Sequence, residues 1–133
     1  MLDHVSIGTA DFARARAFYD AVMTALGYEV AMALEEYQVV GYGTGGKPSF
    51  WIHGPKGCEM AGHGQFGSGP GQHISFVAPD RRAIDAFHAA GVAHGARDNG
   101  APGLRPHYHP GYYGAFLVDP DGHRIEACCH RPE

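Results

Sequence analysis

Two stretches of this chain of 133 residues repeat one another, and this repetition constrains the fold more than any other feature. The residues His73-Ile-Ser-Phe closely match His4-Val-Ser-Ile, and the second histidine follows the first by 69 residues. The same spacing relates the aspartate and the phenylalanine that follow each stretch, Asp11 to Asp80 and Phe18 to Phe87. A match that persists at one spacing predicts an internal duplication.

The first half of the chain predicts one helix and four strands. Residues 3–9 alternate along their length, as in a half-buried strand. Asp11 is placed to cap the helix that follows, and Gly27 is placed to end it. Three more strands are expected, over residues 28–34, 37–42 and 49–53.

The second half predicts the same order of elements. A strand over residues 72–78 leads to Asp80, which caps a second helix, and residues 95–111 show little regular pattern. Two strands are expected over residues 112–118 and 124–129. We therefore expect an α+β fold, a single domain of two βαβββ modules. Module one covers about residues 1–54 and module two about residues 72–131, with a glycine-rich connection over residues 54–71.

Composition excludes several classes of partner. The formal net charge of −4 leaves no basic stripe, so nucleic acid is not an expected partner. The apolar runs are too short to span a bilayer, and the first residues show no signal-peptide pattern. Three cysteines, an odd number without metal-type spacing, favour a reducing, cytoplasmic location over a disulfide framework.

Two histidines and one glutamate are the candidate metal ligands. If the modules pair about a pseudo-twofold axis, His4 and His73 can converge between them. Glu126 lies in an apolar run, where an unpaired carboxylate is costly to bury. Two imidazoles and one carboxylate form a facial triad with open positions on a divalent metal. The alternatives are histidines with no ligand role, and a Glu126 paired with Arg124 or Arg105.

The segment from Arg105 to Tyr113 collects further candidates for chemistry. His107 or His109 could act as a general acid or base, and Tyr113 could donate to a developing oxyanion. Arg105 could bind an anionic group of the substrate, with Tyr108 and the more distant Trp51 as aromatic contacts. The alternative is a proline-stiffened loop whose aromatic side chains pack on the sheet edge.

Motifs at both ends of the chain resemble a known family. The run His4-Val-Ser-Ile, with Arg14-Ala15 and Phe18-Tyr19, is similar to the opening of the glyoxalase/bleomycin-resistance/dioxygenase superfamily. The run from Asp119 to Gly122, followed by Ile125-Glu126, resembles its closing hairpin and metal-ligand strand. The resemblance implies paired βαβββ modules that form an open, cup-like mixed sheet around a metal site, commonly in a homodimer. It also implies that the ligands are His4, His73 and Glu126.

The resemblance further implies an activity. We expect a glyoxalase-like lyase or isomerase with one divalent ion, which could be zinc, manganese, iron or nickel. The ion would be chelated by two adjacent oxygens of a small substrate and would stabilise an oxyanionic intermediate. One alternative is an extradiol-type dioxygenase that uses non-haem iron. Another, from a different class, is a metal-free protein that sequesters a drug, with Trp51 and the aromatic residues of 105–113 as a stacking pocket.

Two positions differ from the patterns of relatives. Many relatives carry a fourth ligand on the last strand of module one. Matching the turn at Gly46 to the turn at Gly122 places Phe50 at that position, opposite Glu126. Phe116 stands where extradiol dioxygenases usually carry a tyrosine. The three remaining ligands are similar to the dioxygenase set.

Overall fold

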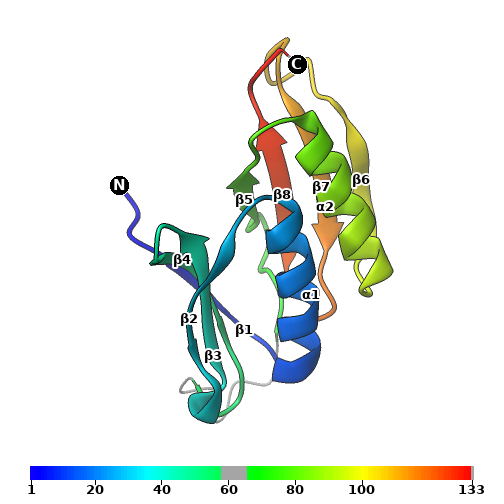
Figure 1. Cartoon of the computed structure of the whole chain (residues 1–133). Helices are drawn as coiled ribbons and strands as arrows, with labels where there is room; N and C mark the ends of the chain where they lie inside the picture. Colours follow the sequence, from blue (N-terminus) through cyan, green and yellow to red (C-terminus); the bar gives the residue numbers. More distant parts are fainter. Residues whose placement is uncertain (58–65, 133) are drawn as a thin grey trace.

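Two modules of the same βαβββ design make up the computed structural model, which describes residues 1–57 and 66–132 (Figure 1). The predicted α+β fold of two such modules is confirmed. Residues 58–65 of the expected connection lie outside the described residues. Module one contains β1 (Val5–Gly8), α1 (Phe12–Ala25), β2 (Glu29–Leu34), the 3-10 turn η1 (Glu35–Tyr37), β3 (Val39–Thr44) and β4 (Lys47–His53). Module two contains β5 (Ile74–Val77), α2 (Arg81–Ala93), β6 (Arg97–Leu104), β7 (Tyr113–Val118) and β8 (Arg124–Cys129).

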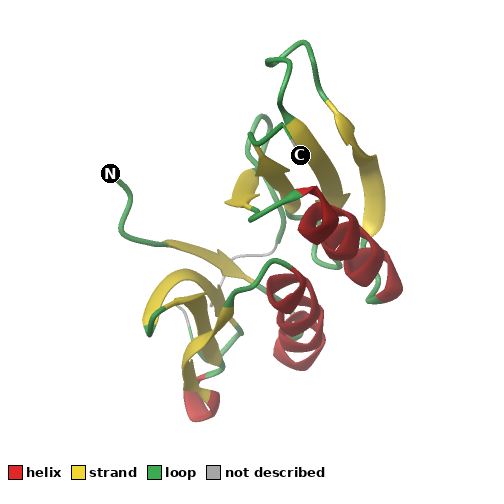
Figure 2. Cartoon of the chain, turned by 45° about the horizontal axis from the view of Figure 1, so that its top comes forward, coloured by secondary structure: helices red, strands yellow, loops and turns green. Residues whose placement is uncertain are grey.

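Each module forms its own mixed four-stranded sheet. The strand orders are β1-β4-β3-β2 and β5-β8-β7-β6. In both sheets the first pair is parallel and the other pairs are antiparallel. One helix covers one face of each sheet, and α1 and α2 lie beside each other (Figure 2). Within residues 1–57 and 66–132, neither α-helix covers the opposite face of either sheet, which is called the helix-free face below.

Both helices begin where the sequence predicts, and α1 also ends at the predicted position. The side chain of Asp11 accepts a hydrogen bond from the backbone N–H of Arg14, and Asp80 does the same for Ala83. Such bonds satisfy N–H groups that the first helical turn leaves open. Gly27 has φ +85°, which is the left-handed conformation of a helix terminator. Neither helix within the described residues is long and apolar enough to cross a bilayer.

The helix-covered faces of both sheets share one hydrophobic core. Phe18 of α1 and Phe87 of α2 are fully buried in it. Phe50 of β4 and Phe76 of β5 meet edge to face, with their ring centres 4.9 Å apart. This contact continues the core from one module into the other.

Hydrogen bonds from the β7–β8 hairpin join module two to module one. The carboxylate of Asp121 accepts bonds from the Thr9 hydroxyl at 2.5 Å and from the Arg14 guanidinium at 3.1 Å. Asp119 accepts a bond from the buried hydroxyl of Tyr19 at 2.6 Å. His123 donates from Nε2 to the carbonyl of Gly8 at 2.7 Å. These contacts fix β1 and the start of α1 against the hairpin that leads into β8.

Strand β6 is the main difference from the sequence prediction. The eight residues Arg97–Leu104 pair with β7, although the sequence shows little regular pattern there. The pairing contains irregular steps between Asp98 and Gly100 and between Gly100 and Gly103. The strand therefore depends on its partner and on bulges rather than on the β-propensity of its own residues.

Candidate metal centre on the second sheet

His73 and Glu126 lie side by side on the helix-free face of the second sheet. Nε2 of His73 is 3.1 Å from Oε2 of Glu126. The glutamate side chain is 3% exposed, whereas that of the histidine is 48% exposed. One nitrogen and one oxygen donor therefore meet at the border between the sheet and solvent.

Tyr112 holds the second oxygen of the same carboxylate. Its hydroxyl donates to Oε1 of Glu126, so both carboxylate oxygens have a partner. Burial, followed by the bond to Glu126, raises the pKa of Tyr112 far above its usual value. The phenol therefore stays protonated and acts as a donor that orients Glu126.

The expected arginine alternatives for Glu126 are not what the structure shows. Arg124 donates to the backbone carbonyls of Gln72 and Gly69. Arg105 likewise donates to the carbonyls of Leu104 and Ala101. Within the described residues, the hydrogen-bond partners of Glu126 are His73 and Tyr112.

His4 lies on the other sheet, apart from this pair. Its Nδ1 is 2.6 Å from the carboxylate of Asp3, which also binds Lys47. With Trp51 and His53 it lines a cavity of about 500 Å³. Across residues 1–57 and 66–132, no three His, Cys, Asp or Glu side chains are grouped to hold a metal ion. A single chain thus brings together two of the three predicted ligands.

The strand register corrects the predicted equivalent of Glu126. Ser6 pairs with Trp51 in the first sheet, and Ser75 pairs with Glu126 in the second. Because the two serines are matched by the repeat, Trp51 is the counterpart of Glu126, and the prediction of Phe50 was wrong by one residue. The β3–β4 hairpin has two loop residues between Thr44 and Lys47, whereas β7 and β8 are joined by five. Turns of different length cannot be matched by their glycines.

The segment that follows β6 surrounds Tyr112 with rings. Tyr108 and His109 contact the ring of Tyr112, with ring centres 4.9 Å and 5.5 Å away. Nε2 of His109 is 2.7 Å from Nδ1 of His130. His107 packs on Tyr108, with ring centres 4.3 Å apart. The sequence did not single out Tyr112 or His130 as site residues, although Tyr112 lies within the candidate segment from Arg105 to Tyr113.

Tyr113 lies on the opposite face of β7. Its hydroxyl donates to Asp85 of α2 at 2.8 Å, and the guanidinium of Arg81 lies over its ring. It pairs with Cys129, whose side chain is in the core. The predicted oxyanion role is therefore not supported by the position of Tyr113, and Tyr112 is the tyrosine that faces Glu126.

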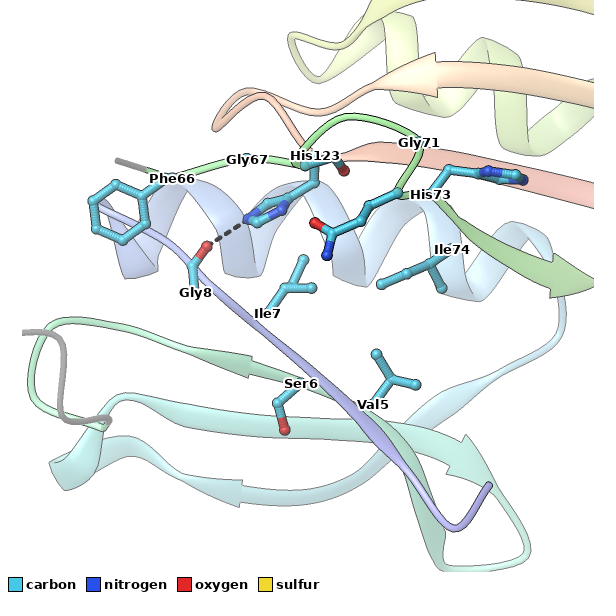
Figure 3. Close-up of a pocket in the computed structure, with 12 residues that line it drawn as sticks. Val5, Ser6, Ile7, Gly8, Phe66, Gly67, Gly71, His73, Ile74 and His123 are labelled. Carbon is cyan, nitrogen blue, oxygen red and sulfur yellow. Dashed lines mark hydrogen bonds between the residues drawn. The ribbon is translucent and has the colours of Figure 1, made fainter. Parts of the chain in front are cut away.

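A cavity of about 640 Å³ separates the strand edges of the two modules. It is lined by β1 and by the segment that leads into β5, including Gln72 and His73 (Figure 3). Figure 3 shows His123 reaching across it to the carbonyl of Gly8. His73 thus borders both this cavity and the helix-free face that carries Glu126.

The fold and the His73–Glu126 pair define a protein of two paired βαβββ modules with a polar site on an open sheet. The family model of the Glyoxalase/Bleomycin resistance protein/Dioxygenase superfamily matches residues 1–127, and the chain belongs to this superfamily. No curated protein matches the chain significantly.

Solved structures agree with the family. A glyoxalase/bleomycin resistance protein from Albidiferax ferrireducens T118 is 32% identical, with a TM-score of 0.81 over 96% of this chain and 98% of that chain. A family enzyme from Burkholderia phytofirmans PsJN is 24% identical, with a TM-score of 0.69 over 97% of this chain and 98% of that chain. A lactoylglutathione lyase from Agrobacterium tumefaciens is 20% identical, with a TM-score of 0.60 over 96% of this chain and 92% of that chain. The last two show a common fold.

Proposed function

We propose that the chain is a metal-dependent lyase or isomerase of the glyoxalase type that acts as a homodimer. His73 and Glu126 of one copy would hold a divalent ion together with His4 of the second copy. The observation that carries the proposal is the contact of 3.1 Å between Nε2 of His73 and Oε2 of Glu126.

The chemistry of the pair suits such an ion. An imidazole nitrogen and a carboxylate oxygen fit zinc, manganese, iron or nickel. A carboxylate that is 3% exposed is costly to bury unless it is paired, and a cation offsets that cost. The bond from Tyr112 to Glu126 is the kind of outer contact that fixes a metal ligand. When bound, the ion would act as a Lewis acid on two adjacent substrate oxygens.

The face around His4 supports a second copy as the source of the third ligand. His4 lies on the helix-free face of the first sheet with Trp51. Exposed Met32 and Leu34 extend the apolar surface across β2. An exposed apolar surface of this kind marks an interaction site, and most homo-oligomers are symmetric dimers. In such a dimer each centre would take one ligand from one copy and two from the other.

The remaining side chains near Glu126 would bind and orient the substrate. Tyr108 would contribute a ring, and His109 would move a proton. The backbone N–H of Gly111 donates to Nδ1 of His109, so the ring proton of neutral His109 is on Nε2. From there it is donated to His130.

Metal analysis of protein purified without chelator tests the proposal first. We expect one divalent ion per chain, which is lost in His4→Ala, His73→Ala and Glu126→Ala. His94→Ala is the matched control, because His94 bonds to the carbonyl of Ala90 on α2. A metal-free protein, or retention of the ion in the three variants, would overturn the proposal.

Mixing two inactive variants tests the shared centre. The variant His4→Ala keeps His73 and Glu126, and the variant Glu126→Ala keeps His4. Random pairing of the two would restore about a quarter of the wild-type centres. If all three ligands came from a single chain, mixing would restore no centres. The experiment therefore tests whether two copies share each centre, independently of whether a metal binds.

A metal-free binding protein is the second candidate. A Cβ on Gly41 would lie 2.9 Å from the indole of Trp51, so the ring lies directly on this glycine and lines the cavity near His4. Such an aromatic platform would stack a flat ligand. Ligand binding that survives in His73→Ala, in protein without metal, would favour this candidate.

The residue at position 116 bears on the choice between the two enzyme activities. Phe116 pairs with Glu126 and offers no hydroxyl, which favours the lyase or isomerase over the dioxygenase.

A further inference from the structure

We propose that Arg105 forms a binding site for a carboxylate group of the substrate, next to the His73–Glu126 pair. The proposal rests on the proposed function for the identity of the neighbouring centre. It assigns a substrate class, small carboxylic acids, that the metal ligands alone do not define.

The guanidinium of Arg105 is held on the site face of the second sheet. It lies over the ring of Phe116, 5.4 Å from the ring centre. Nη2 donates to the carbonyl of Ala101 at 2.7 Å. Phe116 pairs directly with Glu126 across the strands, and its ring centre is 6.5 Å from that of His73. The ring of Phe116 thus lies between the guanidinium of Arg105 and the two candidate metal ligands.

Two glycines of β6 create the space for this arginine. A Cβ on Gly100 would lie 2.9 Å from the ring of Phe116 and 3.3 Å from Nη2 of Arg105. A Cβ on Gly103 would lie 3.1 Å from Nη1. Both glycines lie at the irregular steps of the strand, and bulges beside active sites commonly re-aim a side chain. The irregularity of β6 therefore has a direct effect, which is the seating of Arg105 on Phe116.

The charge of Arg105 has no acidic partner within the described residues. Arg14, Arg16 and Lys47 are paired with aspartates, whereas Arg124, like Arg105, donates to backbone carbonyls. The bonds of Arg105 go to backbone carbonyls, and the oxygens of Glu126 are taken by His73 and Tyr112. A guanidinium has five N–H donors in a planar fork that matches a carboxylate. The unused donors of Arg105 are therefore suited to an incoming carboxylate.

A metal-free titration tests this site without depending on the neighbouring centre. In protein kept in chelator, benzoate is the probe and benzamide is its neutral counterpart. We expect benzoate to shift the NMR signal of the Arg105 Nε–H group and benzamide to leave it unchanged. In Arg105→Gln, benzoate affinity should fall about tenfold or more, because one bidentate charged contact is lost. Arg97→Gln, at the start of the same strand, is the matched control.

The possible results separate the two proposals. Equal binding of benzoate and benzamide, or unchanged benzoate affinity in Arg105→Gln, would overturn the carboxylate site. The variant Arg105→Lys controls for a folding defect. It keeps the positive charge and loses the planar pair of N–H donors, so we expect a benzoate affinity between those of the wild type and Arg105→Gln. Benzoate binding in a protein that never takes up metal would contradict only the proposed function. Metal uptake without benzoate binding would contradict only the proposed carboxylate site.

Discussion

Trp51 occupies in module one the register position that Glu126 occupies in module two. Both lie beside a serine of the neighbouring parallel strand, Ser6 in one case and Ser75 in the other. The duplicated halves therefore differ at the position that matters most for a metal. Module one offers His4 with an indole, and module two offers His73 with a carboxylate.

Replacing Trp51 with a carboxylate should change metal binding. In Trp51→Glu, a second carboxylate would stand beside His4 at the equivalent of Glu126. We expect the Kd for zinc to fall about tenfold or more, because a further anionic ligand becomes available. Competition with a chromophoric chelator measures this Kd. Trp51→Gln removes the same indole without adding a charge, and equal affinities for the two variants would contradict the expectation.

The variant Glu126→Gln should separate metal binding from folding. The amide of glutamine can still accept a bond from Tyr112, and it removes a buried charge. We expect the metal-free free energy of unfolding to stay within about 1 kcal/mol of wild type or to rise. The increase in Tm on adding zinc should disappear, since ligand stabilisation requires binding to the folded state. Thermal unfolding with and without zinc checks both parts, and Glu36→Gln on exposed η1 is the control.

Tyr112→Phe should weaken metal binding without removing a ligand. The hydroxyl of Tyr112 fixes one oxygen of Glu126, and loss of such an outer contact typically costs about 10–100-fold in metal affinity. The Kd for zinc, measured as above, should rise by that factor while the stoichiometry stays the same. Tyr108→Phe is the control, because the side chain of Tyr108 is exposed and contacts Tyr112 through its ring. An unchanged Kd in Tyr112→Phe would show that Glu126 is oriented without the hydroxyl.

Tyr19→Phe should lower stability in a way that depends on pH. Burial raises the pKa of Asp119 above its usual value, while the bond from Tyr19 acts in the opposite direction. Ionisation of Asp119 therefore lowers the free energy of unfolding as the pH rises from 3.8 through the folded-state pKa. The bond from Tyr19 makes this decrease smaller in the wild-type protein. At pH 7 we expect Tyr19→Phe to lose about 1–3 kcal/mol in the free energy of unfolding, because a buried acceptor loses its donor.

The loss should shrink as the pH falls through the pKa of Asp119, where the carboxyl is protonated in both proteins. Urea unfolding of wild type and variant across this range measures the difference. Tyr37→Phe, at an exposed tyrosine, should show no such trend. A loss that stays constant or grows in acid would contradict the assigned role of Tyr19.

The starts of both helices and the end of α1 could be predicted because local residues determine them. Asp11 and Asp80 provide the caps, and Gly27 adopts the conformation that ends a helix. The pairing of His73 with Glu126 also followed from the sequence, since both lie on strands that the repeat and the closing hairpin define. The helix caps need no information about distant contacts, whereas the expectation for His73 and Glu126 relied on the repeat and on the resemblance of the closing hairpin to the family.

The features that were missed depend on distant contacts. Strand β6 contains Asn99, Gly100 and Pro102, which are turn-forming residues, and it is held by β7. The choice between Tyr112 and Tyr113 depends on the pairing of Tyr113 with Cys129. Side chains alternate between the two faces of a strand, so the face of each tyrosine cannot be assigned until the register of the strand is known. The separation of His4 from His73 depends on how the modules pack, which no local pattern specifies.

The two ends of the boundary between the modules differ in their hydrogen bonds. At one end Asp121, Asp119 and His123 bind module one through several short hydrogen bonds. At the other end the Tyr28 hydroxyl donates to the carbonyl of Val77, beside a cavity of about 520 Å³. Any parting of the modules should therefore start near Tyr28 and pivot about the Asp121 turn. Such a motion would alter the spacing between the edges of β1 and β5 while leaving His73 and Glu126 together on their own sheet.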